Sequence, residues 1–153
     1  MMRRTLHRLS RRRLFGWLIM TAAMAFVCVM GAVRDYRYSG DIVWDAGYAD
    51  GMHTARTLHR PVLLYFHAAT CDWCRKMDIE TFTDPGVVTQ AHGYVCIRID
   101  QLRATDLTRK YGVTELPTAI ITDAEGTSLV KRTGFLDTQA MLELLKQSTS
   151  AGH

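Results

Sequence analysis

The sequence of 153 residues contains only four cysteines, and only Cys71 and Cys74 stand close together. A structural zinc site uses four ligands, usually two such pairs or one pair followed by two closely spaced histidines. No second pair exists, and the histidines on either side of the pair are scattered at His53, His59, His67 and His92. We therefore expect no metal site.

Acidic residues are missing from the start of the chain. No Asp or Glu precedes Asp35, whereas residues 1–13 contain six arginines, so the remaining 13 basic residues stand against 15 acidic ones. The net charge of +4 is thus a property of the tail. The rest of the chain has no Lys/Arg stripe to supply phosphate contacts, which excludes nucleic acid as an expected partner. Hydrophobic residues make up 48% of the sequence, which excludes general disorder.

Charge is also absent from residues 14–33, which read "LFGWLIMTAAMAFVCVMGAV". A helix of this length spans roughly 30 Å, the thickness of a bilayer core. We interpret residues 1–13 as a basic cytoplasmic tail, 14–33 as a transmembrane signal-anchor helix and 34–40 as a linker. The positive-inside rule then places the remaining chain on the periplasmic side of a bacterial cytoplasmic (inner) membrane.

Two alternatives to an anchor remain open. A cleaved signal peptide would leave a soluble periplasmic protein, although its apolar region is usually shorter and ends in a small-x-small site. The segment "SRRRLF" at residues 10–15 also resembles a twin-arginine export signal. Cys28 is interpreted as an apolar filler, because Phe26 and Val27 precede it where a lipoprotein cysteine needs small residues.

The rest of the chain alternates between helical and strand patterns, with no internal repeat. We expect helices at 41–58, from the cysteine pair to about 81, at 84–92, at 105–112 and from 137 onward, and strands at 61–67, 94–100, 118–123 and 128–133. Asp84 and Asp137 are predicted N-caps. The first two strands should be parallel and the last two an antiparallel hairpin. The prediction is an α/β domain at 41–148, a mixed central sheet flanked by helices, followed by a tail at 149–153.

A Cys-x-x-Cys pair directly after a buried strand has a specific chemical meaning. At the start of a helix, unpaired N–H groups and the helix dipole stabilise the thiolate of Cys71. Cys74, one turn later, can then resolve the mixed disulfide that Cys71 forms. A passive structural disulfide is less well supported, because so short a loop restricts the unfolded chain little.

The segments "PVLLYFHAATCDWCRKM", "YGVTELPTAIITDAEG" and "TGF" resemble the thioredoxin-like superfamily. The resemblance covers Asp41 to Gln147. It is nearest to the membrane-associated bacterial group that includes the C-terminal periplasmic domain of the thiol:disulfide interchange reductase. The residues matching that group's pattern are Cys71, Cys74, Arg75, Thr81, Phe82, Thr83, Asp84, Pro85 and Val87, together with Leu116, Pro117 and Thr118.

The resemblance implies a substrate groove beside the cysteines. The Leu116–Pro117 bond is expected to be cis, with Leu116, Pro117 and Thr118 offering backbone groups to the substrate chain. Trp73 is expected to be an exposed apolar contact for partner chains. No organic cofactor is needed, because the dithiol itself carries two electrons.

Three positions call for comment. Tyr65 stands where thioredoxin has a buried aspartate, so a water or another carboxyl must accept the proton of Cys74. His67 stands in place of a tryptophan, and we interpret it as an edge-of-core histidine, with tuning of Cys71 as the alternative. Cys96 is interpreted as a small buried residue.

The residues inside the motif bear on the direction of electron flow. Asp72 places a negative charge beside Cys71, which should raise the pKa of that thiol and favour a reductant or isomerase. Arg75 and Lys76 act in the opposite direction.

The predicted function is a membrane-anchored thiol–disulfide oxidoreductase. Its expected partners are proteins with disulfides or oxidised cysteines and an integral-membrane electron donor. The alternative is a thioredoxin-fold binding or assembly module without redox turnover. Alkylation of Cys71 at neutral pH separates the two. The motif lacks the threonine or serine arrangement of a peroxide-reducing enzyme.

Overall fold

The computed structural model describes residues 41–45 and 47–150. The elements follow in the order α2 (Tyr48–Leu58), β1 (Val62–His67), α3 (Asp72–Glu80), α4 (Pro85–Ala91), β2 (Val95–Asp100), α5 (Thr105–Lys110), β3 (Thr118–Thr122), β4 (Ser128–Thr133) and α6 (Thr138–Ser150). The tail, anchor and linker predicted for residues 1–40 lie outside the described residues. Within the described ranges, no helix combines the length and hydrophobicity needed to cross a bilayer.

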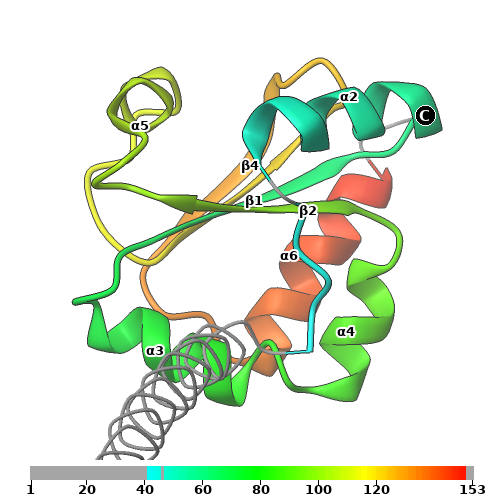
Figure 1. Ribbon diagram of the computed structural model, residues 1–153. Coiled ribbons are helices and arrows are strands. Elements are labelled where there is room, and N and C mark those ends of the chain that lie inside the picture. The colour runs from blue at the N-terminus through cyan, green and yellow to red at the C-terminus, as the bar shows by residue number, and fades with distance from the viewer. Residues whose placement is uncertain (1–40, 46, 151–153) are drawn as a thin grey trace, which may run out of the picture. The chain divides into compact units, whose positions relative to one another are not determined.

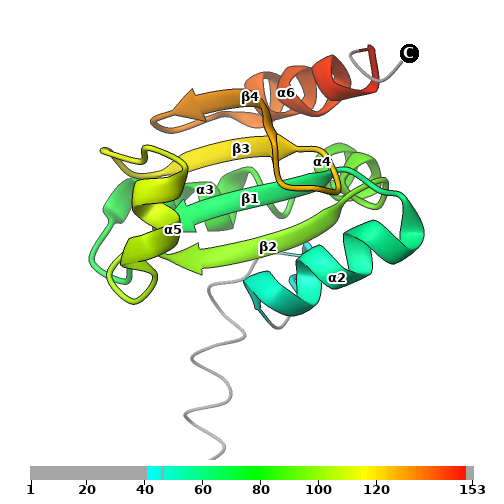
Figure 2. The same ribbon diagram turned by 90° about the horizontal axis from the view of Figure 1, so that it is seen from above.

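The four strands form one mixed sheet in the order β2-β1-β3-β4. Strand β1 pairs with β2 in parallel and β4 is antiparallel to β3, as predicted. Strand β1 also pairs antiparallel with β3. Figure 2 shows β1 between β2 and β3, with β4 at one edge. Since β1 is central, its apolar sequence is buried on both faces.

Helices cover both faces of the sheet. In Figure 1, α2 and α5 lie on one face and α3, α4 and α6 on the other. Alternate residues of β1 divide between two buried clusters: Leu63 and Tyr65 join one, and Val62, Leu64 and Phe66 join the other. The predicted apolar stripe of the last helix is buried in the first cluster at Met141, Leu144 and Leu145.

The predicted helix at 41–58 is wrong in its first part. Helix α2 begins only at Tyr48, after Gly47 with extended backbone. Upstream, Asp45 forms an isolated parallel bridge with Ile97 of β2, and Trp44 packs on the opposite side of the sheet from α2. The apolar spacing through Trp44 suggested a helix, but these residues instead extend along the edge of the sheet, where β2 offers free backbone groups.

Both predicted N-caps are present. Oδ1 of Asp84 accepts hydrogen bonds from the backbone N–H groups of Gly86 and Val87, at 2.9 and 3.1 Å. Oδ1 of Asp137 accepts from the N–H of Ala140 at 2.8 Å. These contacts fix where α4 and α6 begin, because they satisfy N–H groups that have no partner inside the helix.

Candidate active site

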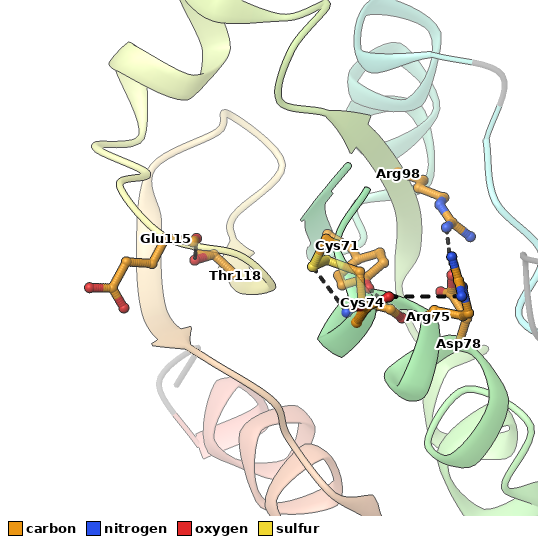
Figure 3. Close-up of a disulfide and its surroundings, with 9 residues drawn as sticks. Cys71, Cys74, Arg75, Asp78, Arg98, Glu115 and Thr118 are labelled. Atoms are coloured by element: carbon orange, nitrogen blue, oxygen red, sulfur yellow. Dashed lines mark hydrogen bonds and ion pairs between the residues drawn. A yellow bond between two sulfur atoms is a disulfide. The ribbon is translucent and has the colours of Figure 1, made fainter. Parts of the chain in front are cut away.

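The cysteine pair lies where the chain leaves β1 and enters α3 (Figure 3). Cys71 is the N-cap of α3, and its Sγ accepts a hydrogen bond from the backbone N–H of Cys74 at 3.0 Å. The two residues form a disulfide, with Cα atoms 5.2 Å apart. After reduction, the same N–H group and the helix N-terminus stabilise a thiolate on Cys71.

The two cysteines differ in accessibility. Cys71 is partly exposed, whereas Cys74 is only 1% exposed and belongs to the buried cluster beneath α3. A disulfide in another protein can therefore reach Cys71 but not Cys74. This difference favours attack by Cys71 and resolution by Cys74.

A loop with a cis peptide bond lies across from the disulfide. The Leu116–Pro117 bond is cis, as the resemblance implies. Oγ1 of Thr118 donates to the carbonyl of Glu115 at 2.7 Å, and the N–H of Gly134 donates to the carbonyl of Pro117 at 2.8 Å. In Figure 3, Glu115 and Thr118 of this loop lie on the side of Cys71 away from Arg98. Leu116 packs against the same buried cluster as Cys71.

Trp73 is 57% exposed, beside the disulfide at the surface. Its ring centroid lies 5.9 Å from that of Phe135, which follows β4. Nζ of Lys76 lies 5.4 Å from the centroid of Trp73 and 4.7 Å from that of Phe135. Sequence reasoning singled out Trp73 but missed Phe135, which is 62 positions away and joins Trp73 only through the fold.

The predicted tuning residues Asp72 and Arg75 pair with each other. The closest atoms of their side chains are 3.8 Å apart, and the Asp72 side chain is 89% exposed. Water and the guanidinium both screen so exposed a charge, so the effect of Asp72 on Cys71 is weaker than its position in the sequence suggests.

His67, the third predicted tuning residue, is the last residue of β1. Its ring stacks on Tyr65 with 5.8 Å between centroids, and in the strand register it lies beside Asp100. Burial lowers the pKa of His67 to about 4, the charge of Arg98 adds to this, and Asp100 opposes it. The imidazole is therefore neutral at pH 7 and partly buried, which matches the edge-of-core interpretation.

Tyr65 occupies the place of the missing aspartate. Its hydroxyl donates a hydrogen bond to the backbone carbonyl of Cys74 at 3.3 Å. Burial, and secondarily the charge of Asp78, raise the pKa of Tyr65, so its hydroxyl stays protonated. Tyr65 holds the helix turn that carries Cys74. Because its hydroxyl keeps its own proton, Tyr65 cannot accept the proton of Cys74.

Asp78 supplies a carboxyl from α3, the helix that also carries Cys74. It lies four residues after Cys74 on α3, so both side chains project from the same helix face. Asp78 is 3% exposed, and its Oδ2 pairs with the guanidinium of Arg98 at 2.7 Å. Its Oδ1 is buried without a hydrogen-bond partner in the described part of the chain. Burial raises the pKa of Asp78 to about 6, opposed by the charge and hydrogen bond of Arg98.

Sequence reasoning left the proton acceptor open as a water or another carboxyl and did not identify Asp78. Two signals could have found it: the four-residue spacing from Cys74, and Arg98 on β2, which lies beside Tyr65 in the strand register. Elsewhere in the described chain, no group of three His, Cys, Asp or Glu side chains is arranged to hold a metal ion.

Comparison with known proteins agrees with this geometry. Residues 48–149 match the thioredoxin-like domain family. The chain belongs to this family. The thiol:disulfide interchange protein DsbD of Vibrio vulnificus (strain CMCP6) is 31% identical over 99 residues, which is 61% of this chain and 17% of that protein. The chain therefore spans about a sixth of the length of this curated relative.

Solved structures share the fold. The DsbH oxidoreductase superposes with a TM-score of 0.64 at 21% identity, covering 74% of this chain and 88% of that one. A thioredoxin from Thermus thermophilus superposes with a TM-score of 0.66 at 23% identity, covering 72% of this chain and 89% of that one. The oxidised C-terminal domain of DsbD from Neisseria meningitidis superposes with a TM-score of 0.57 at 24% identity, covering 69% of this chain and 97% of that one. Family membership and the Cys71–Cys74 pair together make this DsbD-like chain a thiol–disulfide oxidoreductase.

Proposed function

We propose that this protein is a membrane-anchored reductase or isomerase of disulfides in extracytoplasmic proteins. The observation that carries the proposal is the asymmetry of the dithiol. Cys71 is accessible at a helix N-terminus, whereas Cys74 is buried on the same helix face as the carboxyl of Asp78. The similarity to part of DsbD supports the choice of disulfides as substrates.

The first step joins the two proteins. The thiolate of Cys71 attacks one sulfur of the partner's disulfide, the partner's S–S bond breaks, and its other sulfur leaves as a thiolate. The product is a mixed disulfide between Cys71 and the partner. The groove beside the cis peptide bond holds the partner chain during this step.

The second step releases the partner. Cys74 gives its proton to the carboxylate of Asp78, and the resulting thiolate attacks the sulfur of Cys71. The mixed disulfide breaks, and the partner's second sulfur leaves as a thiolate. The partner has gained two electrons and the Cys71–Cys74 disulfide has formed. Above its pKa of about 6, Asp78 is ionised and able to accept this proton.

The direction of transfer follows from the charges around the dithiol. The buried carboxylate of Asp78 disfavours a second negative charge nearby, so the reduced pair is less stable and donates electrons more readily. A reductant in an oxidising compartment must be recharged. We propose that an integral-membrane dithiol donor does this, and that the predicted anchor at residues 14–33 holds the domain beside it.

Cysteine variants test the exchange reaction. With insulin as the substrate and dithiothreitol as the reductant, the full chain should accelerate reduction, and Cys71→Ser should abolish the effect. Cys74→Ser should accumulate a mixed disulfide that maps to Cys71 by mass spectrometry. Insulin reduction that survives in Cys71→Ser would sink the proposal.

Localisation needs its own test. In bacterial cells, the chain should stay in the membrane fraction after an alkaline wash and keep the mass of the full sequence. A membrane-impermeant maleimide should label Cys71 from the periplasmic side. A shortened, soluble periplasmic product would support the cleaved-signal alternative, and labelling only after cell lysis would contradict both.

A further inference from the structure

Three side chains next to the disulfide form a surface feature that the exchange steps do not use. Trp73 and Phe135 pack together, and Nζ of Lys76 lies 5.4 Å from the ring centroid of Trp73 and 4.7 Å from that of Phe135. Lysine is attracted to aromatic rings in this arrangement. We name this set of Trp73, Phe135 and Lys76 the aromatic subsite.

The aromatic subsite connects the cysteine motif with the cis peptide loop. Trp73 lies between the two cysteines in the chain. Phe135 follows Gly134, whose N–H donates to the carbonyl of Pro117 in the cis peptide loop. A polypeptide that brings a sulfur to Cys71 along this loop must therefore pass the aromatic subsite within a residue or two of its reacting cysteine.

The chemistry of the aromatic subsite selects its occupant. Trp73 leaves 57% of its surface exposed, an apolar area that a neighbouring side chain can cover. The ammonium of Lys76 has Glu80 as its carboxylate neighbour, 3.8 Å away, and both side chains are exposed. So exposed a pair is weak, and an incoming carboxylate can replace Glu80 as the partner of Lys76.

We propose that the aromatic subsite determines substrate preference. It accepts an apolar side chain beside the partner's reacting cysteine, together with a neighbouring acidic residue that pairs with Lys76. This inference rests on the proposed exchange function and adds to it the class of sequence that is exchanged fastest.

The test uses four short peptides whose single cysteine carries 5-thio-2-nitrobenzoate as a mixed disulfide. Phe or Ala precedes the cysteine, and Glu or Lys follows it. In the Cys74→Ser background of the full chain, the Cys71 thiolate attacks the peptide sulfur, and the nitrobenzoate leaves as a coloured thiolate. The rate constant is read from absorbance, and mass spectrometry confirms the peptide on Cys71.

The peptide with Phe and Glu should react about tenfold faster than the peptide with Ala and Lys. Trp73→Ala and Phe135→Ala should remove the preference for Phe, and Lys76→Glu should reverse the preference between Glu and Lys. Trp73→Ala and Lys76→Glu alter exposed side chains, so they stay informative if Phe135→Ala fails to fold. Leu58→Ala is the matched control, because Leu58 is 50% exposed and precedes β1, at the opposite end from Cys71.

Equal rates for all four peptides would overturn the aromatic subsite. Methyl methanethiosulfonate, a neutral reagent with neither a ring nor a peptide, should modify Cys71 in the Cys74→Ser background and in the Leu58→Ala control. If Cys71 fails to react even with this reagent, the exchange function itself is wrong. If Cys71 reacts with the reagent but its rate constant is the same for every peptide sequence, only the proposed role of the aromatic subsite is wrong.

Discussion

The sulfur atoms of Cys71 and Cys74 lie close together in the chain but have different surroundings. One sits at a helix N-terminus within reach of solvent, and the other is buried on the helix face that also carries a carboxyl. The burial of Asp78 raises the pKa of its carboxyl, and the ion pair of Oδ2 with Arg98 lowers it. Reactivity therefore depends on neighbouring groups, each of which a single substitution can test.

Replacement of Asp78 by Asn should slow the release of the partner. Asn keeps the shape of the side chain but cannot accept the proton of Cys74, and loss of a general base costs roughly a hundredfold in rate. In single-turnover experiments, the wild-type rate should rise as the pH passes about 6, where Asp78 ionises, and the Asp78→Asn rate should lack this rise. The control is Asp106→Asn, an exposed carboxyl that also pairs with an arginine. An unchanged pH profile in Asp78→Asn would remove Asp78 from the mechanism.

His67 should make the protein less stable in mild acid. Its folded-state pKa of about 4 lies below the ordinary value of 6.5, so between these values the unfolded chain binds the proton and the folded chain does not. Stability is therefore lost as the pH falls below 6.5. Between pH 7 and 5, the free energy of unfolding should fall by about 1 kcal/mol less in His67→Gln than in wild type, after allowance for the partial exposure of His67. Urea unfolding at the two pH values measures this difference. The exposed His53→Gln serves as control, and parallel curves for His67→Gln and wild type would contradict the account.

At the scale of elements, the close approach of α2 to β2 depends on one glycine. A Cβ on Gly51 would lie 2.5 Å from Cδ1 of Ile97, which is fully buried. Gly51→Ala should destabilise the fold by about 1–2 kcal/mol, because overpacking outweighs the gain of about 1 kcal/mol in helix propensity. Gly47→Ala meets nothing within 4 Å and should cost much less. Chemical denaturation measures both, and a stabilised Gly51→Ala variant would refute the argument.

Elements with strong local signals were predictable from the sequence. The apolar run of β1, the hairpin of β3 and β4 and the Asp84 cap all depend on residues close together in the chain. Residues 41–45 were not predictable, because their conformation depends on a bridge to β2, and Trp44 happens to fit helical spacing. The ion pair of Asp78 with Arg98 and the contact of Phe135 with Trp73 needed the register of β1 with β2 and the end of β4, which periodicity does not show.

At the scale of the whole molecule, the fold assembles the site from segments far apart in the chain. The parallel pair of β1 and β2 places Tyr65 beside Arg98, α3 adds the cysteines and Asp78, and the loop before β3 adds the cis peptide bond. The two-layered core holds these segments in place. The central claim is that this arrangement makes the pair an electron donor.

The reduction potential of the Cys71–Cys74 pair tests that claim most directly. The full chain would be equilibrated with dithiothreitol or glutathione buffers of defined ratio, and the fraction of bonded pair would be read by alkylation and mass mapping. The account predicts a potential of about −250 mV or lower, near that of thioredoxin. A potential near about −120 mV would make the protein an oxidant and contradict the assigned direction of electron flow.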